Sequence, residues 1–563
     1  MVTFRWSSKI VQVLFILSLF VTTVTAQQNT ISKKGELLYN GIQLPIVWPP
    51  DYGQLTREPM RVPYLENPPD VIPIDVGRQL FVDEFLIEQT TLKRTFHTPE
   101  CHAMNPILTY DKYWEKEGAA PMAAPFSDGV WYDPNDQLFK MWYIGGYLLT
   151  TCYAVSRDGI RWNKPRLDIV PGTNVVLYAD SVQKKIDERF RDSGTLWLDH
   201  EEWNLDKRFK MFVTGRDANG KWVLQLRGSP DGIHWSKPIA TSPVIGDRST
   251  VHYNPFRKVW VKGSRIGPES VGRARAYGEN KDVVKCIEGA EQVQWMGADR
   301  LDPHNPNPEF SAIPPELYNH DAVAYESIML GLFSIWQGPS NKTCDERKIQ
   351  KRNEILVGFS RDGFHYSRPN RERFIGVNEK PDSWNWGNVQ SVGGCCLVVG
   401  DNLYFYYSGR ALPSGFWDGC VSTGLAILRR DGFASLDAGE QVGTLETRPV
   451  LFKGKYLFVN VSTPAGELRV EVLDRNNEVI EPFIKSNCEP ISADKTLYLV
   501  KWRNAADLSS LIGKPVKFRF TLRNGSLYSF WVSPEISGAS FGYVAGGGPG
   551  FIGNLDTVGL KGY

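Results

Sequence analysis

One short phrase occurs four times in this chain and restricts its fold more than any other feature. It reads SRDGIRW at 156–162, SPDGIHW at 229–235, SRDGFHY at 360–366 and RRDGFAS at 429–435. Asp-Gly is a turn dipeptide, and an aromatic residue shortly after it can pack on a neighbouring layer. The middle gap is close to two ordinary gaps, and WMGAD at 295–299 lies near the place of a degenerate copy. The spacing therefore predicts five repeated units.

Each unit carries short runs of aromatic and β-branched residues upstream of its turn, which is the composition of β-strands. The second run of each unit reads FKMWYIGG (139–146), FKMFVTGR (209–216), VWVKGSR (259–265), LGLFSIW (330–336) and LYFYYSGR (403–410). A pair of β-sandwiches would also use short strands. Five matched units favour radial repetition instead, so we predict an all-β fold with a five-bladed β-propeller over 76–440.

The remaining segments differ in composition from the repeats. Short strand-like runs over 441–535 predict a small C-terminal β-sandwich. Residues 27–75 are Pro-rich and predicted to form an extended N-terminal segment, and the Gly-rich tail at 536–563 is predicted to be poorly ordered. The stretch at 76–110 precedes the first full blade, and we expect it to supply strands that complete the last blade and close the ring.

The N-terminus predicts export. Arg5 and Lys9 precede the apolar run VLFILSLFV, and small residues follow up to Ala26. This pattern is typical of a secretory signal over 1–26, since the apolar run is far shorter than the roughly 20 residues of a membrane anchor. We therefore expect a secreted or periplasmic protein with no membrane contact after signal removal. An oxidising compartment would allow disulfides among the eight cysteines, whose pairing the sequence leaves open.

The charge balance and the ligand spacing limit the classes of partner and cofactor that the sequence predicts. The chain has 64 basic and 63 acidic residues, so nothing in the net charge favours nucleic acid. No close-spaced set of ligands predicts a metal centre, and we expect no cofactor. A structural Ca²⁺ remains open because acidic residues line the predicted axis, although no contiguous calcium loop occurs. The oligomeric state is not predicted.

Five such blades, an export signal and a C-terminal sandwich resemble the five-bladed propeller glycoside hydrolases, the broad group of families 32, 43, 62 and 68. In layout the chain is most similar to family 32 N-terminal-like proteins. The resemblance implies catalytic carboxylates at the funnel end of the axis, on the innermost strands of successive blades. Glycoside cleavage needs one carboxylic acid to protonate the leaving oxygen and one carboxylate as base or nucleophile.

The candidate catalytic residues are acids at the expected funnel ends of the first three blades. Arg191-Asp192 is similar to the start of the Arg-Asp-Pro motif of family 32, whose Asp stabilises the transition state, although Ser193 replaces the Pro. Asp247 lies on the next blade, where that family carries its acid in a Glu-Cys pair; here the pair is Asp-Arg.

The family's Trp-x-Asn-Asp-Pro motif of blade 1 is absent, so Asp128 and Glu117 compete for the carboxylate of that blade. Each acid could instead accept backbone N–H bonds at a turn.

Several other residues are candidates for substrate binding. Arg191 and Arg248 could clamp a carboxylate or phosphate, or pair with neighbouring Asp residues. The remaining candidates lie on the fourth and fifth blades and are His320, Asp321, Trp386, Asn388 and Gln390. The sequence thus predicts a secreted carbohydrate-active enzyme, a glycoside hydrolase acting on a carbohydrate substrate. A non-catalytic glycan-binding propeller and a propeller phosphorylase are the alternatives.

Overall fold

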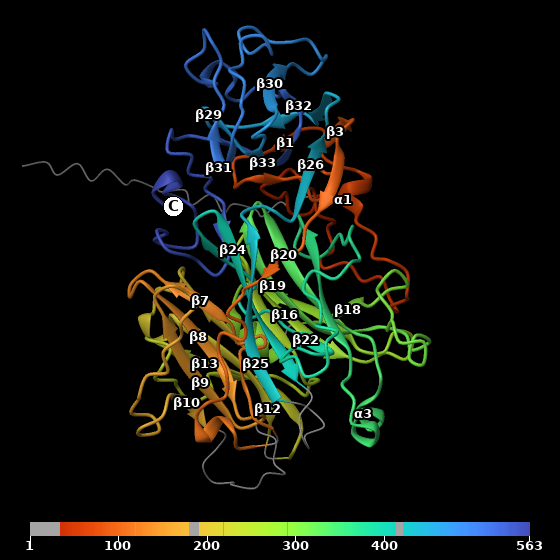
Figure 1. Ribbon diagram of the computed structural model, residues 1–563, viewed down its shortest axis with the longest axis vertical. Coiled ribbons are helices and arrows are strands. Elements are labelled where there is room, and N and C mark those ends of the chain that lie inside the picture. Colours follow the sequence, from red (N-terminus) through yellow and green to blue (C-terminus); the bar gives the residue numbers. More distant parts are fainter. Residues whose placement is uncertain are drawn as a thin grey trace, which may run out of the picture.

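The computed structural model describes residues 34–118, 120–178, 191–217, 219–289, 291–411 and 420–562. The predicted signal at 1–26 lies outside the described residues. Separate hydrophobic clusters divide the chain into a propeller and a sandwich, which occupy opposite ends of the molecule (Figure 1). The described part contains short helices only, and none is long and apolar enough to cross a membrane. These helices are α1 (Pro63–Glu66), α2 (Val283–Gly289), α3 (Asn341–Arg347) and the 3-10 turns η1 (Tyr113–Glu115), η2 (Leu205–Lys207), η3 (Ser509–Leu511) and η4 (Gly559–Gly562).

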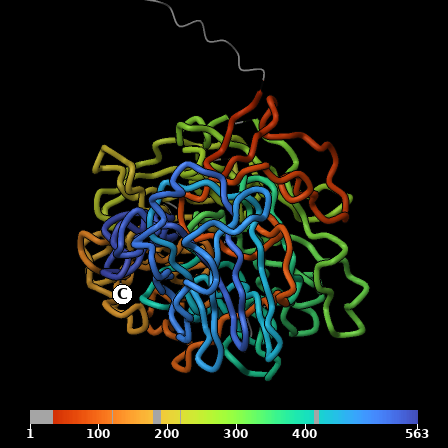
Figure 2. The backbone as a smooth tube through the Cα atoms, turned by 90° about the horizontal axis from the view of Figure 1, so that it is seen from above, coloured from red at the N-terminus to blue at the C-terminus, as the bar shows by residue number. Residues whose placement is uncertain are grey.

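The propeller has five blades that follow one another around a ring (Figure 2), which confirms the predicted fold. The fourth and fifth blades are joined into one sheet by a parallel strand pair at Asn353 and Asn388. Blade 1 contains β6 (Ala123–Ala124), β7 (Val130–Asp133), β8 (Leu138–Gly145), β9 (Thr150–Ser156) and β10 (Val175–Tyr178). Blade 2 contains β11 (Ser193–Leu198), β12 (Phe209–Arg216), β13 (Trp222–Ser229) and β14 (Ala240–Thr241). Blade 3 contains β15 (Thr250–Asn254), β16 (Val259–Ile266), β17 (Ala274–Asn280) and β18 (Val293–Gly297). Blade 4 contains β19 (Glu316–Glu326), β20 (Ile328–Trp336) and β21 (Asn353–Ser360), and blade 5 contains β22 (Asn388–Gln390), β23 (Leu397–Val399), β24 (Asn402–Ala411) and β25 (Cys420–Arg429).

The ring is closed by a strand from before the first blade. β5 (Glu100–Cys101) pairs antiparallel with β25, with Cys101 opposite Ala426. The last blade therefore takes its outermost strand from the N-terminal side of the chain, as we expected for 76–110. Closure of this kind joins sequence-distant segments and protects a sheet edge that would otherwise be free to pair with another chain.

The repeated phrase forms the same turn in the first three copies. In the first copy, Asp158 Oδ1 accepts hydrogen bonds from the backbone N–H groups of Ile160 and Arg161, both at 2.8 Å. The turn of the second copy packs against the preceding blade, where Trp142 Nε1 donates to the carbonyl of Gly232 at 2.7 Å. A side chain on Gly232 would meet that indole at 2.4 Å, so this position requires glycine. The phrase therefore fastens neighbouring blades together.

The sandwich is built from segments on both sides of the propeller. One sheet contains β2 (Gln79–Leu80), β4 (Lys93–Phe96), β26 (Ala434–Ala438), β29 (Tyr456–Ser462), β31 (Asp494–Leu499) and β33 (Gly525–Ser533). The other contains β3 (Ile87–Thr90), β27 (Gly443–Thr447), β30 (Glu467–Leu473) and β32 (Lys517–Arg523), while β1 (Ile72–Pro73) pairs in parallel with β28 (Val450–Leu451). The strands at 79–96, which the sequence analysis assigns to the propeller, thus pair with C-terminal strands.

The Gly-rich tail is ordered against the propeller, so the prediction of poor order was wrong for 536–562. β34 (Tyr543–Val544) pairs with the far end of β19. The glycines that follow reach two further blades, where Tyr132 N donates to the Gly546 carbonyl at 2.8 Å and Val398 N donates to the Gly547 carbonyl at 2.9 Å. Their composition reflects close backbone packing, because a Cβ on Gly548 would lie 1.7 Å from the carbonyl oxygen of Val398. The tail covers the sandwich-facing end of the axis.

A buried ion-pair network joins the two domains at the same end. Arg78 Nη1 lies 3.0 Å from Asp431 Oδ2, and Arg430 Nη2 lies 3.1 Å from Glu326 Oε1 and 3.0 Å from Asp556 Oδ2. All five side chains are fully buried. Removing one partner of such a network leaves an uncompensated buried charge, at a typical cost of about 3–5 kcal/mol. The network therefore ties the N-terminal segment, two blades and the tail together.

The eight cysteines all lie in the described part of the chain, where each is a free thiol. Burial raises the pKa of the Cys152 thiol to about 12. Cys101, in contrast, is exposed on the strand that closes the ring. Packing and ion pairs, rather than the disulfides that export would allow, hold these ranges of the chain together.

Candidate active site

The innermost strands of the five blades begin at the end of the propeller that faces away from the sandwich. Asp128 precedes β7, Asp192 precedes β11 and Arg248 precedes β15. Because these strands run in the same direction around one axis, the residues just before them converge. The structure thus brings together the sequence-predicted residues Asp128, Arg191, Asp192 and Arg248, and we call these four side chains the axial cluster.

The first pair of the axial cluster is Asp128 with Arg191. The Arg191 Nη2 atom donates to Asp128 Oδ1, and its Nε atom donates to Thr151 Oγ1 at 2.6 Å. Asp128 is fully buried and Arg191 is 2% exposed. Burial raises the pKa of Asp128 to about 6, although the nearby Arg191 and Arg248 cations oppose that shift. The carboxyl group can therefore hold a proton close to neutral pH.

The second pair is Asp192 with Arg248. Arg248 Nε lies 3.1 Å from Asp192 Oδ2, and the guanidinium carbon lies 4.7 Å from the centroid of the Phe126 ring. The Arg410 guanidinium lies 5.5 Å from the same ring. The guanidinium groups of Arg248 and Arg410 therefore both contact the Phe126 ring, an arrangement that is favourable for cations.

The axial end holds many buried polar atoms that lack a hydrogen-bond partner in the structure. A buried polar group without a partner costs about 1–3 kcal/mol, so native proteins rarely keep one without a reason. Such a concentration predicts a polar ligand that supplies the missing partners. The atoms are Asp128 Oδ2, Arg191 Nη1, Ser193 Oγ, Arg248 Nη1 and Nη2, and the side-chain amide atoms of Asn388 and Gln390.

The backbone around the axial cluster is strained. The backbone φ angles of Phe126, Arg248 and Ser391 are 44°, 57° and 60°, values that residues other than glycine rarely adopt. Each of the three lies at or near the end of an inner strand. Conformations of this kind persist where the surrounding structure enforces them, and they concentrate at functional sites.

Asp321 supports the cluster from beneath. Asn319 Nδ2 donates to Ser127 Oγ at 2.8 Å, to Asp321 Oδ2 at 2.9 Å and to Ser391 Oγ at 3.0 Å. Val392 N also donates to Asp321 Oδ2, at 3.0 Å. Burial raises the pKa of Asp321 to about 6. This network joins blades 1, 4 and 5, so the geometry gives Asp321 a positioning role rather than the substrate contact that the sequence suggested.

Other candidates lie outside the cluster. Asp247 sits at the rim with 27% of its side chain exposed and pairs with Arg265 Nη1 at 3.3 Å. Glu117 is exposed on the loop after η1, and no ion pair among the described residues links it to the cluster. His320 packs between blades, with ring centroids 4.7 Å from Phe333 and 5.3 Å from Trp295.

Burial lowers the pKa of His320 well below its usual value, so the side chain belongs to an aromatic core. Trp386 is half-buried beside β22, where its backbone bridges Asn378. Asn388 and Gln390 are fully buried on β22, at the funnel end.

Sequence reasoning missed Phe126, Arg275 and Arg410 as parts of the site. Arg275 Nη1 donates to the Arg248 carbonyl, and its Nη2 atom donates to the Tyr318 carbonyl at 2.7 Å. It thus holds the strained backbone of Arg248. For Arg410 a signal exists, because the second strand-like runs of the second, third and fifth units all end in a small residue followed by Arg.

No metal centre can be assigned to the described residues, because no group of three or more His, Cys, Asp or Glu is arranged there so that it could hold a metal ion. His252 lies near the axis, but burial lowers its pKa to about 3 and its ring centroid lies 6.2 Å from that of His320. Two buried imidazoles alone do not complete a ligand set. The arrangement is suited to acid–base chemistry by side chains.

Comparison with known proteins finds distant structural similarities. No protein-family model and no curated protein sequence matches the chain. Among solved structures, it is similar to a thermostable family-43 glycoside hydrolase, with 11% identity and a TM-score of 0.38 over 58% of this chain and 96% of that one. It is also similar to the exo-inulinase from Aspergillus awamori, with 11% identity and a TM-score of 0.35 over 76% and 99% of the two chains. A family 43 protein from Bacillus licheniformis has 10% identity and a TM-score of 0.36, over 78% and 100%. Similarities at this level do not establish an activity.

Proposed function

We propose that this chain is a secreted glycoside hydrolase that cleaves a glycan carrying an anionic group, with its reaction centre at the axial cluster. The observation that carries the proposal is the pairing itself. Two buried Arg–Asp pairs lie side by side at the axis, and each leaves polar atoms without a partner. A sugar with several hydroxyl groups and one anionic substituent would supply both kinds of missing partner.

The two carboxyl groups suit different steps of hydrolysis. Asp128, whose pKa is raised to about 6, would donate its proton to the glycosidic oxygen as the C–O bond breaks. Asp192 forms an ion pair with Arg248, which favours the charged form of the carboxyl group, and it would either activate the attacking water or attack the anomeric carbon itself. In either course water supplies the hydroxyl of one product. If Asp192 is the base, it takes the proton of that water, and proton exchange with solvent restores both carboxyl groups; if Asp192 is the nucleophile, Asp128 takes the proton from the water that hydrolyses the glycosyl–enzyme.

Substrate recognition would fall to the arginines. Arg248 is 2% exposed and uses only Nε for Asp192, so both of its terminal NH₂ groups remain for a ligand. Two parallel N–H bonds from one guanidinium match the oxygens of a carboxylate, sulfate or phosphate. Arg191 Nη1 adds a further buried donor. We therefore place the anionic substituent of the substrate against Arg248.

A reducing-sugar assay tests the proposed hydrolysis. Arabinan, arabinoxylan and inulin serve as neutral substrates, and polygalacturonate and chondroitin sulfate separate carboxylate from sulfate as the anion. Wild type should cleave an anionic polymer, and Asp192→Asn should not. Asp158→Asn is the matched control, because that carboxylate lies in an exposed turn of blade 1 and the amide keeps the oxygen that accepts the backbone bonds. Cleavage that survives in Asp192→Asn would refute the assignment.

A specific observation favours a second candidate, a propeller that binds glycan without cleaving it. On blade 3 the acid Asp247 pairs with Arg265 at the rim, whereas its neighbour Arg248 enters the axis. If binding alone is the function, wild type will bind polymer in a pull-down without releasing reducing ends. Adding inorganic phosphate to the same assay tests the phosphorylase alternative, which predicts a sugar phosphate as product.

The proposed location rests on the pattern at 1–26. Expression of the full chain followed by N-terminal sequencing of the exported protein should give a mature chain that begins at Gln27. Retention of the apolar segment in the exported protein would contradict a cleaved signal.

A further inference from the structure

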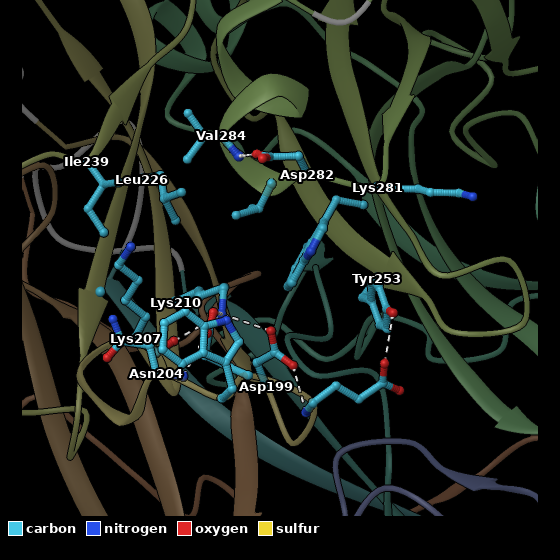
Figure 3. Close-up of a pocket in the computed structure, with 16 residues that line it drawn as sticks. Asp199, Asn204, Lys207, Lys210, Leu226, Ile239, Tyr253, Lys281, Asp282 and Val284 are labelled. Carbon is cyan, nitrogen blue, oxygen red and sulfur yellow. Dashed lines mark hydrogen bonds and ion pairs between the residues drawn. The ribbon is translucent and has the colours of Figure 1, made fainter. Parts of the chain in front are cut away.

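A polar cavity lies at the other end of the propeller from the axial cluster. It has a volume of about 420 Å³ and is formed where blades 2 and 3 meet, at the sandwich-facing ends of β12, β13, β15 and β16. The loop at 199–207 and the segment at 281–284 form its rim (Figure 3). We call it the side cavity. Its volume falls within the usual range of small-molecule sites.

The floor of the side cavity is a saturated ion-pair cluster. Lys210 Nζ lies 2.8 Å from Asp199 Oδ2 and 2.8 Å from Glu202 Oε2, and it donates to the Lys207 carbonyl at 3.0 Å. Its side chain is 3% exposed. An ammonium group has three protons, and these three acceptors use all of them. The floor therefore offers fixed carboxylate oxygens to a ligand, and Lys210 has no proton left to donate to it.

The rim is fixed as well. Tyr253 Oη donates to Glu201 Oε2 at 3.0 Å, and Asn554 Nδ2 of the ordered tail donates to Glu201 Oε1 at 3.3 Å. Asp282 caps its own segment by accepting from Val284 N at 2.8 Å. In Figure 3 the Lys281 side chain extends away from the other labelled residues. These contacts hold the carboxylates in place before any ligand arrives.

Apolar groups complete the side cavity. Leu226, Ile239 and Val284 form one wall, and the Trp260 indole lies beneath Lys210 with its ring centroid 5.7 Å from Nζ. Trp203 is 89% exposed at the rim. Such exposure of a large indole leaves its apolar surface in water, so a ligand with an apolar face would be stabilised by covering it.

We infer that the side cavity binds uncharged sugar residues of a polysaccharide chain. A sugar ring presents an apolar face of C–H groups, which suits Trp203, and equatorial hydroxyl donors, which suit the fixed oxygens of Asp199, Glu201 and Glu202. The lining contains the four carboxylates of Asp199, Glu201, Glu202 and Asp282 against the three lysines Lys207, Lys210 and Lys281, so an anionic sugar would meet a net negative charge. The cavity would hold a long chain on the protein and raise its effective concentration at the axial cluster. Binding at this cavity does not depend on the proposed hydrolysis.

Binding of neutral polysaccharide by wild type and Trp203→Ala tests the inference. Affinity gel electrophoresis with arabinan, arabinoxylan and inulin, each at several concentrations, gives the dissociation constants. Loss of an aromatic contact worth about 0.5–1.5 kcal/mol should weaken binding up to about tenfold. Trp203→Tyr should restore most of the affinity, because it keeps an aromatic face.

Leu205→Ala is the matched control, because Leu205 is 69% exposed on the same loop but does not line the cavity. Its affinity should equal that of wild type. Equal affinity of Trp203→Ala and wild type for every neutral polymer, absence of any neutral binding, or preference of the Trp203-dependent binding for polygalacturonate would overturn the inference.

An Asp192→Asn background separates this site from the axial cluster. If Asp192→Asn still binds neutral polymer and the added Trp203→Ala change weakens that binding, sugar binding by the side cavity is supported even when wild type hydrolyses nothing. If hydrolysis of short oligosaccharides occurs in wild type but Trp203 has no effect on polymer binding, the proposed function stands and the side cavity does not.

Discussion

The axial cluster and the side cavity both place buried cations against carboxylates, yet they differ in whether those cations keep unused hydrogen-bond donors. In the axial cluster, Arg248 uses one nitrogen for Asp192 and keeps two terminal groups without partners. In the side cavity, Lys210 has an acceptor for each of its three protons. A buried cation with unused donors is unstable without a ligand, whereas a saturated one is part of the scaffold. This difference is why we assign the chemistry and the anion to the axis.

The largest expected effect comes from removing a carboxylate of the axial cluster. Positioned acid or base groups contribute about 10²–10⁴-fold to rate, so Asp192→Asn should lower kcat/KM about 10³-fold on the substrate that wild type cleaves. The equivalent change in the side cavity, Asp199→Asn, should leave the rate on a short oligosaccharide unchanged. Equal losses in the two variants would remove the distinction between the regions.

Arg248 should matter for the anion more than for the sugar. Charge-assisted hydrogen bonds are worth about 1.5–3 kcal/mol, so Arg248→Ala should lower kcat/KM about 10–100-fold on an anionic oligosaccharide. The same change should lower kcat/KM by a smaller factor on the neutral analogue, in which the carboxylate is reduced or the sulfate removed. Arg248→Lys keeps the charge but lacks two parallel donors. Its kcat/KM on the anionic oligosaccharide should therefore lie between those of wild type and Arg248→Ala. A loss of equal size on both substrates would mean that Arg248 only orients Asp192.

The pH dependence distinguishes the role of Asp128. Its pKa is raised to about 6, and as general acid it is active only while protonated. The value of kcat/KM should therefore fall as the pH rises above about 6, by about tenfold per pH unit. A rate that instead rises through this range would make Asp128 the base. The measurement is kcat/KM from pH 4 to pH 8 with a short substrate, together with circular dichroism to show that the protein stays folded.

The smallest effect is expected at the side cavity. On a dilute polymer that carries both neutral and anionic sugars, Trp203→Ala should slow hydrolysis by less than about tenfold, since only the local concentration of chain is lost. The rate on a short oligosaccharide should equal that of wild type. A matched loss on both substrates would place Trp203 in the reaction rather than in chain binding.

The repeat made the propeller predictable, because each Asp-Gly turn and each aromatic strand recurs in the chain itself. The sandwich was harder to delimit. Nothing local marks the strands at 79–96 as partners of strands more than three hundred residues away, such as β33 for β2. The Gly-rich tail was misread because glycine permits both disorder and close backbone packing, and only the neighbouring blades decide between them.

The axial cluster was predictable in part. Counting positions along the inner strands placed Asp128, Asp192 and Arg248 at one end, since strands of a ring share their direction. Counting positions could not decide whether Asp247 or Arg248 faces the axis, because adjacent residues of a loop point to different sides. Only the strained backbone at Arg248 settles which of the two side chains enters the axis. His320 was misplaced for a related reason, since its side chain alternates with Asn319 and Asp321 and faces the core between blades.

The central claim is that a glycan places an anionic group on Arg248 beside Asp128 and Asp192. A crystal structure of Asp192→Asn soaked with the anionic oligosaccharide that wild type cleaves tests it most directly. We predict density for the anion against Arg248 Nη1 and Nη2, with the glycosidic oxygen within hydrogen-bond distance of Asp128. An oligosaccharide bound only in the side cavity, with the axial arginines still lacking partners, would contradict the account.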